Sequence, residues 1–154
     1  MLEMGVEAFL LGATIQMIMA QRLVRTICPK CKKEYKVTFE EIKNLGKKFN
    51  IKKDFEPVIT QVTGKALTPD ATFTFYKGEG CSNCAGDGYK GRSSICEIIE
   101  VSEEIKKILL KNGTSKEIED QAKKEGMVPM FTDGMRKVLL GVTTIEEVLR
   151  VMRS

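Results

Sequence analysis

The residues of this chain best suited to chemistry are two cysteine pairs, Cys28-Pro-Lys-Cys31 and Cys81-Ser-Asn-Cys84. In each pair the two-residue spacing allows a tight turn with both sulfurs on one side, and Pro29 presets the φ angle of the first turn. Two such turns together supply the four thiolates of a closed, tetrahedral structural zinc site. We therefore expect Cys28, Cys31, Cys81 and Cys84 to bind one structural zinc ion. A closed set leaves no open position for water, so we expect no zinc catalysis.

Other uses of paired cysteines remain open beside zinc. A redox pair of the thioredoxin type opens a helix in a βαβ unit, whereas the first pair here is led by a proline and followed by lysines. Disulfides are typical of secreted proteins, and the N-terminus shows no basic segment of a secretory signal. Four cysteines also ligate iron–sulfur clusters, for which this spacing gives no support. The fifth cysteine, Cys96, lies in an alternating stretch at 94–98, and we expect it to be a small buried residue of a strand.

Several common enzyme mechanisms lack their residues in this sequence. The chain has no histidine, so neither an imidazole base nor a Cys-His pair can form. Gly64-Lys65 is not preceded by the glycine of a phosphate-binding loop, so we expect no nucleotide site of that type. The paired carboxylates Glu103-Glu104 and Glu146-Glu147 fall in the first turns of predicted helices, where the helix dipole accounts for them. We predict no catalytic residue and no small-molecule substrate in this chain.

Positive charge is concentrated beside the first cysteine pair. The whole chain carries a formal net charge of +4, while the stretch from Lys30 to Lys53 alone holds nine lysines and three acidic residues. A zinc ion with four thiolates has a formal charge of −2, so neighbouring lysines are electrostatically favourable. The simplest interpretation of the other lysines is a solvated surface. The alternative is a stand-alone basic zinc module that binds nucleic acid, with Tyr35, Phe39 and Phe49 as stacking groups.

Three parts of the chain position these residues, namely 1–27, 28–98 and 99–154. The first part reads as one apolar helix from Glu7 to Ile27, because apolar residues recur at helical spacing without a proline. The helix is apolar on more than one face, which implies burial against a larger structure. We therefore expect residues 1–27 to be the C-terminal helix of a missing core, and the chain to be a piece of a longer protein. The apolar run in this helix is too short to span a bilayer.

The middle part holds every cysteine and a lysine-rich insertion at 37–73 between the two pairs. A short helix is expected from Phe39 to Phe49, and the alternating residues 72–76 predict a strand. Glycines around the second cysteine pair indicate tight turns. We expect this part to form a small, β-containing zinc-knuckle subdomain.

The last part reads as four short amphipathic helices with clear start and stop signals. The starts are marked by Ser102, the capping box Thr114-x-x-Glu117, Pro129 and the sequence Thr143-x-x-Glu146. The first three helices end at glycines, namely Gly113, Gly126 and Gly141. We expect the four helices to form a small bundle. The predicted fold class is therefore mainly α with a small β-containing subdomain, an α+β chain.

Three longer motifs follow one another along the chain. The first joins Met4-Gly5-Val6-Glu7-Ala8-Phe9-Leu10-Leu11 and Ala20-Gln21-Arg22-Leu23-Val24-Arg25 to the first cysteine pair. The second runs from Tyr76 to Arg92 around the second pair, and the third from Asp133 to Val148. In this order they resemble the C-terminal region of the type II secretion and type IV pilus assembly ATPases, of the secretion ATPase superfamily. The resemblance covers residues 2–36 and 74–152, while 37–73 resembles nothing we can place.

The resemblance implies a role inside a larger machine. Proteins of that family are cytoplasmic, homo-hexameric rings peripheral to the inner membrane, and the Walker and histidine boxes that hydrolyse ATP precede the region matched here. The chain itself is then structural or coupling, and ATP and Mg²⁺ belong only to the full-length protein. The implied partners are the chain's own ATPase core, neighbouring subunits and an inner-membrane platform protein, and nucleic acid is not expected. Arg22 and Arg25 lie in a matched motif, where either phosphate contact or surface charge would account for them.

Overall fold

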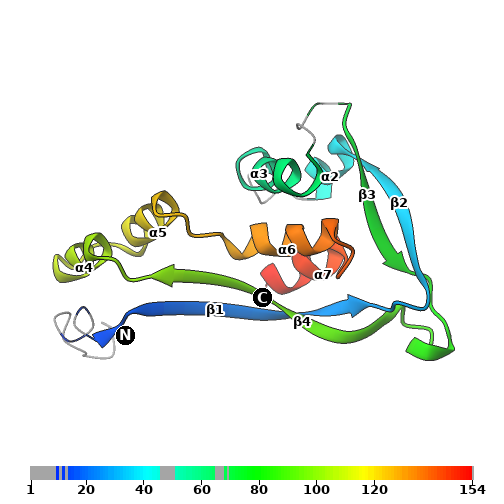
Figure 1. Cartoon of the computed structure of the whole chain (residues 1–154), viewed down its shortest axis with the longest axis horizontal. Helices are drawn as coiled ribbons and strands as arrows, with labels where there is room; N and C mark the ends of the chain where they lie inside the picture. The colour runs from blue at the N-terminus through cyan, green and yellow to red at the C-terminus, as the bar shows by residue number, and fades with distance from the viewer. Residues whose placement is uncertain are drawn as a thin grey trace. The chain divides into compact units, whose positions relative to one another are not determined.

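The computed structural model describes residues 10, 12, 14–45, 51–64, 68 and 70–153. These residues form an α+β structure (Figure 1), which confirms the predicted fold class at that level. The elements in chain order are β1 (Met17–Ile27), β2 (Lys32–Thr38), α2 (Phe39–Leu45), α3 (Ile51–Thr63), β3 (Thr72–Gly78), the 3₁₀ turn η2 (Ser82–Cys84), β4 (Tyr89–Glu100), α4 (Glu103–Leu110), α5 (Ser115–Lys124), α6 (Met130–Leu139) and α7 (Ile145–Met152). No helix in the described part of the chain has the length and apolar character needed to cross a membrane.

The four strands in the described part of the chain form two pairs. β1 pairs with β4, and β2 pairs with β3 in an antiparallel register that sets Tyr35 opposite Phe75 and Val37 opposite Phe73. Successive side chains of a strand point to opposite faces, so these four residues share one face of the β2–β3 pair. Val37, Phe73 and Phe75 are buried there. The alternation that predicted a strand at 72–76 therefore reflects one buried and one solvated face, and β3 confirms it.

The contacts divide the chain into two compact units. One unit comprises Met1–Ala20 and Glu97–Pro129, and the other comprises Gln21–Cys96 and Met130–Ser154. In the first unit, α4 and α5 pack together around a small core of Val101, Ile105 and Ala122. The division into 1–27, 28–98 and 99–154 stays a prediction.

The second unit has the larger core. Helix α6 contacts α3, α7 and strand β3, so helices cover the apolar face of the β2–β3 pair (Figure 1). The buried residues of this core are Val37, Ile42, Val58, Ile59, Phe73, Phe75, Phe131, Met135, Val138, Leu139, Ile145, Val148 and Leu149. One end of the pair, where β2 begins and β3 ends, leads directly into the cysteine pairs. The core thus fixes the two chain segments that carry the sulfurs.

The helix predicted from Glu7 to Ile27 is wrong from Met17 onward, because Met17–Ile27 is strand β1, whereas the described residues 10, 12 and 14 are helical. Residues 7–9, 11 and 13 lie outside the described residues. The consecutive apolar residues Met17, Ile18 and Met19 suit either structure, so their spacing does not decide between helix and strand. The partner decides it, because β4, distant in sequence, supplies the backbone hydrogen bonds of a sheet.

The four C-terminal helices are present, but they do not form one bundle. α4 and α5 belong to the first unit, whereas α6 and α7 belong to the second. Each helix has an apolar side, which predicts that it is buried but not which element covers it. The predicted start signals of α4 and α5 are confirmed. The Ser102 hydroxyl accepts from the Ile105 N–H, and Thr114 and Glu117 form a reciprocal capping box.

The start of the fourth helix lies one residue later than predicted. Thr144, not Thr143, caps α7, because the Thr144 hydroxyl accepts a hydrogen bond from the Glu147 N–H. The Thr143 hydroxyl instead donates to the backbone oxygen of Arg25 at 2.8 Å. Both threonines are candidate caps by type, and the tertiary contact with Arg25 selects between them.

Candidate metal centre

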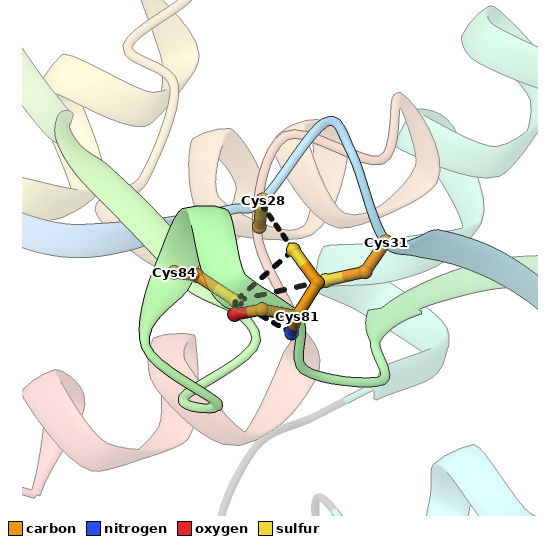
Figure 2. Close-up of side chains that lie close together, drawn as sticks. All are labelled: Cys28, Cys31, Cys81 and Cys84. Carbon is orange, nitrogen blue, oxygen red and sulfur yellow. Dashed lines mark hydrogen bonds between the residues drawn. The ribbon is translucent and has the colours of Figure 1, made fainter.

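The four predicted ligands lie together in the second unit. Cys28 follows β1 and Cys31 precedes β2, while Cys81 precedes η2 and Cys84 ends it. Figure 2 shows the four cysteine side chains close together, from two different segments of the chain. Their sulfur atoms all lie within 4.8 Å of one another. The structure therefore brings together cysteines that are distant in the sequence.

The spacing of the sulfurs fits a single tetrahedral ion. The Sγ–Sγ distances are 3.9 Å for Cys28–Cys81, 3.8 Å for Cys31–Cys84 and 3.7 Å for Cys81–Cys84. A zinc–sulfur bond of about 2.3 Å sets neighbouring thiolates of a tetrahedron about 3.8 Å apart. A disulfide would bring two sulfurs to about 2.05 Å, and all five cysteines are free thiols. The four thiols are thus placed to hold one metal ion.

Hydrogen bonds point at the sulfurs from the turn that carries the second pair. The backbone N–H groups of Cys81 and Gly88 donate to Cys84 Sγ at 3.2 and 3.3 Å. The side-chain amide of Asn83 donates to Cys28 Sγ at 3.3 Å. Such donors stabilise thiolates, the form of cysteine that binds a metal.

Hydrogen bonds and burial shift the pKa values of Cys28, Cys31 and Cys84 in different directions. The bond from Asn83 lowers the pKa of Cys28 to about 6, while burial raises the pKa of Cys31 to about 12. Burial also acts against ionisation of Cys84, but hydrogen bonds from the backbone of Cys81 and Gly88 outweigh it and lower its pKa. Hydrogen bonding therefore favours the thiolate forms of Cys28 and Cys84, the forms that bind a metal.

Two glycines allow the chain to cross itself beside the sulfurs. A Cβ at Gly78 would lie 2.0 Å from the backbone oxygen of Gly88, and a Cβ at Gly88 would lie 2.6 Å from the oxygen of Gly78. The same Gly88 oxygen accepts from the N–H of Cys28 at 2.9 Å. The end of β3 and the turn after Cys84 thus pass so closely that neither position accepts a side chain.

Cys96 lies in β4, as expected, and outside the four-sulfur group. It is partly exposed rather than fully buried, and its backbone N–H donates to Asp133.

Two of the basic residues near the site contact other side chains. Lys33 pairs with Glu79 at 2.7 Å, and the Lys32 ammonium lies over the ring of Tyr76.

Two of the three aromatic residues assigned to base stacking, Tyr35 and Phe39, contribute to packing. Tyr35 meets Phe75 edge to face, with ring centroids 6.2 Å apart, and Phe39 packs against the main core. Phe49 lies outside the described residues. Tyr35 and Phe39 are each only partly exposed, so packing already uses part of both rings.

The sequence predicts the position of Glu147 in a helix first turn, but it does not predict that this carboxylate is buried. Glu147 is only 2% exposed, although it stands in a helix first turn like the exposed Glu103 and Glu104. Its carboxylate accepts from the guanidinium of Arg25 at 2.8 Å and from that of Arg150 at 2.9 and 2.8 Å. The one available signal was its position four residues before Val151, on the apolar side of α7.

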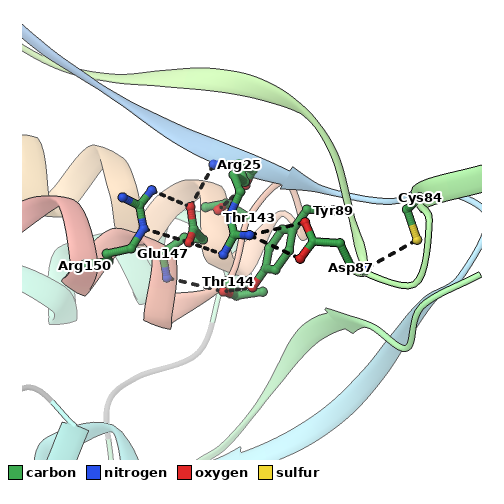
Figure 3. A network of polar contacts seen from close by, with 9 residues as sticks. Arg25, Cys84, Asp87, Tyr89, Thr143, Thr144, Glu147 and Arg150 are labelled. Carbon is green, nitrogen blue, oxygen red and sulfur yellow. Dashed lines mark hydrogen bonds and ion pairs between the residues drawn. The ribbon is translucent and has the colours of Figure 1, made fainter.

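Arg25 joins Glu147 to the turn that carries the second cysteine pair (Figure 3). Its guanidinium lies 3.2 Å from the carboxylate of Asp87 and 4.2 Å from the ring centroid of Tyr89. The Tyr89 hydroxyl in turn lies 2.9 Å from that of Thr144. Arg25 thus has a structural role in this chain, on the strand that leads into Cys28. Arg22 donates to the backbone oxygen of Val151.

The fold and the site define a class, an α+β chain with a closed group of four cysteines that can hold one metal ion. Comparison with known proteins adds the family. A sequence profile described as "Type II/IV secretion system protein" matches residues 1–150, a range that includes 37–73. The chain belongs to this family, as its motifs predicted.

Curated relatives agree with this assignment. The chain is 37% identical over 147 residues to the type IV pilus assembly ATPase PilB of Thermus thermophilus, covering 96% of the chain and 14% of the relative. It is 37% identical to PilB of Pseudomonas aeruginosa and 34% identical to type II secretion system protein E of the same organism, each over 100% of the chain. The chain spans 24% and 26% of these two relatives.

Proposed function

We propose that this chain is the C-terminal, zinc-stabilised region of an ATPase that powers type II secretion or type IV pilus assembly. The observation that carries the proposal is similarity over the whole chain to proteins named for both systems. The cluster of Cys28, Cys31, Cys81 and Cys84 supports zinc, because a closed set of four thiolates is typical of structural zinc sites.

The proposed role of the region is structural and coupling. Zinc supplies a tetrahedral cross-link among thiolates. The chain's own contribution is to hold the end of β1, the start of β2 and the turn after β3 in one place. ATP hydrolysis, with ATP and Mg²⁺, is assigned to the remainder of the full-length protein, because the chain carries no phosphate-binding loop motif.

The proposed setting follows the family. The region contacts its own ATPase core and neighbouring subunits of a homo-hexamer, and through them an inner-membrane platform protein. The protein is then cytoplasmic and peripheral to the membrane. The exposed apolar residues Met17, Ile18, Met19 and Leu23 on β1 are consistent with a strand that a larger assembly covers.

The test uses the full-length protein with Cys81→Ser and, as the matched control, Cys96→Ser. Full-length protein is expected to hydrolyse ATP, and Cys81→Ser is expected to lose zinc and reduce hexamer formation and hydrolysis, whereas Cys96→Ser keeps all three. Full-length protein without nucleotide hydrolysis, even with its membrane partner added, would overturn the proposal.

The second candidate is a basic zinc module that binds nucleic acid, favoured only by the lysines from Lys30 to Lys53. Binding of this kind weakens steeply with salt, because it releases counterions from phosphates. An electrophoretic shift at low salt that disappears with added salt would support it. Absence of a shift at low salt rejects it, and that is the result we expect.

A further inference from the structure

Asn83 reaches from one cysteine pair to the other. It belongs to the turn between Cys81 and Cys84, yet its side-chain amide donates to the sulfur of Cys28, at 3.3 Å. The sequence alone gives no reason to single it out, because it occupies a variable position of a C-x-x-C motif. This hydrogen bond therefore links the turn of Cys81 and Cys84 directly to a sulfur of the first cysteine pair.

Lys90 fixes which way the amide of Asn83 points. The Lys90 ammonium donates to the side-chain oxygen of Asn83 at 2.9 Å and to its backbone oxygen at 2.9 Å. An ammonium group can only donate, so it requires the oxygen of the amide on its own side. The NH₂ group is therefore directed to the sulfur of Cys28, and the chemistry of both neighbours agrees on this orientation.

The buried sulfur of Cys28 receives its one side-chain amide bond from Asn83, beside a hydrogen bond from the backbone of Lys30. Cys28 is 0% exposed, so water does not reach its side chain to solvate a thiolate. Cys84 is buried as well, but two backbone N–H groups serve its sulfur. For Cys28, the side chain of Asn83 supplies the larger of two such bonds, and the backbone of Lys30 supplies the other.

We propose that Asn83, held in place by Lys90, is a positioning residue of the metal centre. It orients and stabilises the Cys28 thiolate, and so it strengthens metal binding without being a ligand. Residues that hydrogen-bond to metal ligands commonly contribute a factor of about 10 to 100 in metal affinity. The inference rests on the metal centre proposed above.

Zinc affinity tests the proposal quantitatively, by competition with a chromophoric chelator. Asn83→Leu, which keeps the size of the side chain but removes the donor, is expected to weaken zinc binding by about 10-fold to 100-fold. Ser82→Ala, in the same turn, is the control and is expected to bind zinc as the native chain does. Lys90→Met is expected to weaken zinc binding less than Asn83→Leu does. Lys90→Arg, which keeps a cationic donor, is expected to bind zinc as the native chain does.

A spectroscopic measurement separates this role from a general loss of structure. In the chain loaded with cadmium-113, a through-bond NMR correlation is expected between the metal and the side-chain amide protons of Asn83, because the coupling passes through the N–H···S bond. Absence of that correlation in a loaded chain, together with native zinc affinity of Asn83→Leu, overturns the role of Asn83 while leaving the metal centre intact. If the native chain takes up neither zinc nor cadmium, the metal centre itself fails.

Discussion

Glu147 and Arg25 meet twice, although they are far apart in the sequence. The backbone N–H of Arg25 lies 3.0 Å from one carboxylate oxygen of Glu147, and its guanidinium lies 2.8 Å from the other. Arg25 stands three residues before Cys28, and Glu147 lies in the first turn of α7. Helix α7 is therefore held to strand β1, which leads into Cys28, the first candidate ligand.

Removal of this carboxylate is expected to destabilise the chain. Glu147→Ala removes a buried carboxylate that accepts from the Arg25 N–H and from two guanidinium groups, which we expect to lower the free energy of unfolding by about 2–3 kcal/mol. The exposed neighbour Glu146 provides the control, and Glu146→Ala is expected to stay within about 0.5 kcal/mol of the native chain. Urea denaturation of the zinc-loaded chains measures both. Equal stability of the two variants would contradict the role assigned to Glu147.

The same contact gives a dependence on pH. Hydrogen bonds from Arg150 and then from Arg25 lower the pKa of Glu147 from its ordinary 4.5 to about 2 in the folded chain. A lowered carboxyl pKa stabilises the fold above the unfolded value, and this stabilisation is lost as the pH falls from about 4.5 through about 2. In metal-free chains, the stability difference between the native chain and Glu147→Gln should shrink over that range. A difference that does not change with pH would contradict this linkage.

The close crossing beside the sulfurs predicts a large effect of one methyl group. In Gly78→Ala the added Cβ would lie 2.0 Å from the backbone oxygen of Gly88, so the backbone must move. We expect a loss of more than about 3 kcal/mol and weaker metal binding. Gly86→Ala is the matched control, because Gly86 has a φ of +83° but no atom within 4 Å of an added Cβ.

In Gly86→Ala we expect the free energy of unfolding to fall by only about 1–2 kcal/mol, the cost of placing alanine in the left-handed conformation. Thermal unfolding of both variants, with zinc present, compares them. A smaller loss in Gly78→Ala than in Gly86→Ala would show that the chain can relax at the crossing.

Metal removal is expected to loosen residues 142–144, which precede α7, together with the first turn of α7. The N–H of Ile27 donates to the oxygen of Val142, and the hydroxyl of Thr143 donates to the oxygen of Arg25, so this segment is held by residues next to Cys28. Chelation should therefore increase hydrogen exchange at 142–147. Helix α5, which belongs to the other unit, serves as the internal reference. Unchanged exchange at 142–147 after complete removal of the metal would contradict the link.

Local chemistry made much of this structure predictable. The turns at the two cysteine pairs, the cap of Ser102 and the capping box of Thr114 depend on residues within a few positions of each other. The strand at β3 was predictable for the same reason, because its alternation is visible within seven residues. Short-range patterns of this kind need no knowledge of the remaining fold.

The features that escaped prediction depend on distant partners. Whether Met17–Ile27 is a strand depends on β4, and whether Thr143 or Thr144 caps α7 depends on Arg25. The burial of Glu147 depends on the same arginine, since a carboxylate inside a protein is tolerated only with its charge compensated. In each case the residue type was compatible with two structures, and a tertiary contact chose one.

The metal content of the purified chain tests the central claim most directly, measured by elemental mass spectrometry for the native chain, Cys81→Ser and Cys96→Ser. We predict about one zinc per chain in the native protein and in Cys96→Ser, and loss of zinc in Cys81→Ser, because a closed tetrahedral site needs all four thiolates. A native chain without zinc, or loss of zinc with Cys96→Ser rather than Cys81→Ser, would contradict the assignment of Cys28, Cys31, Cys81 and Cys84 as the ligands.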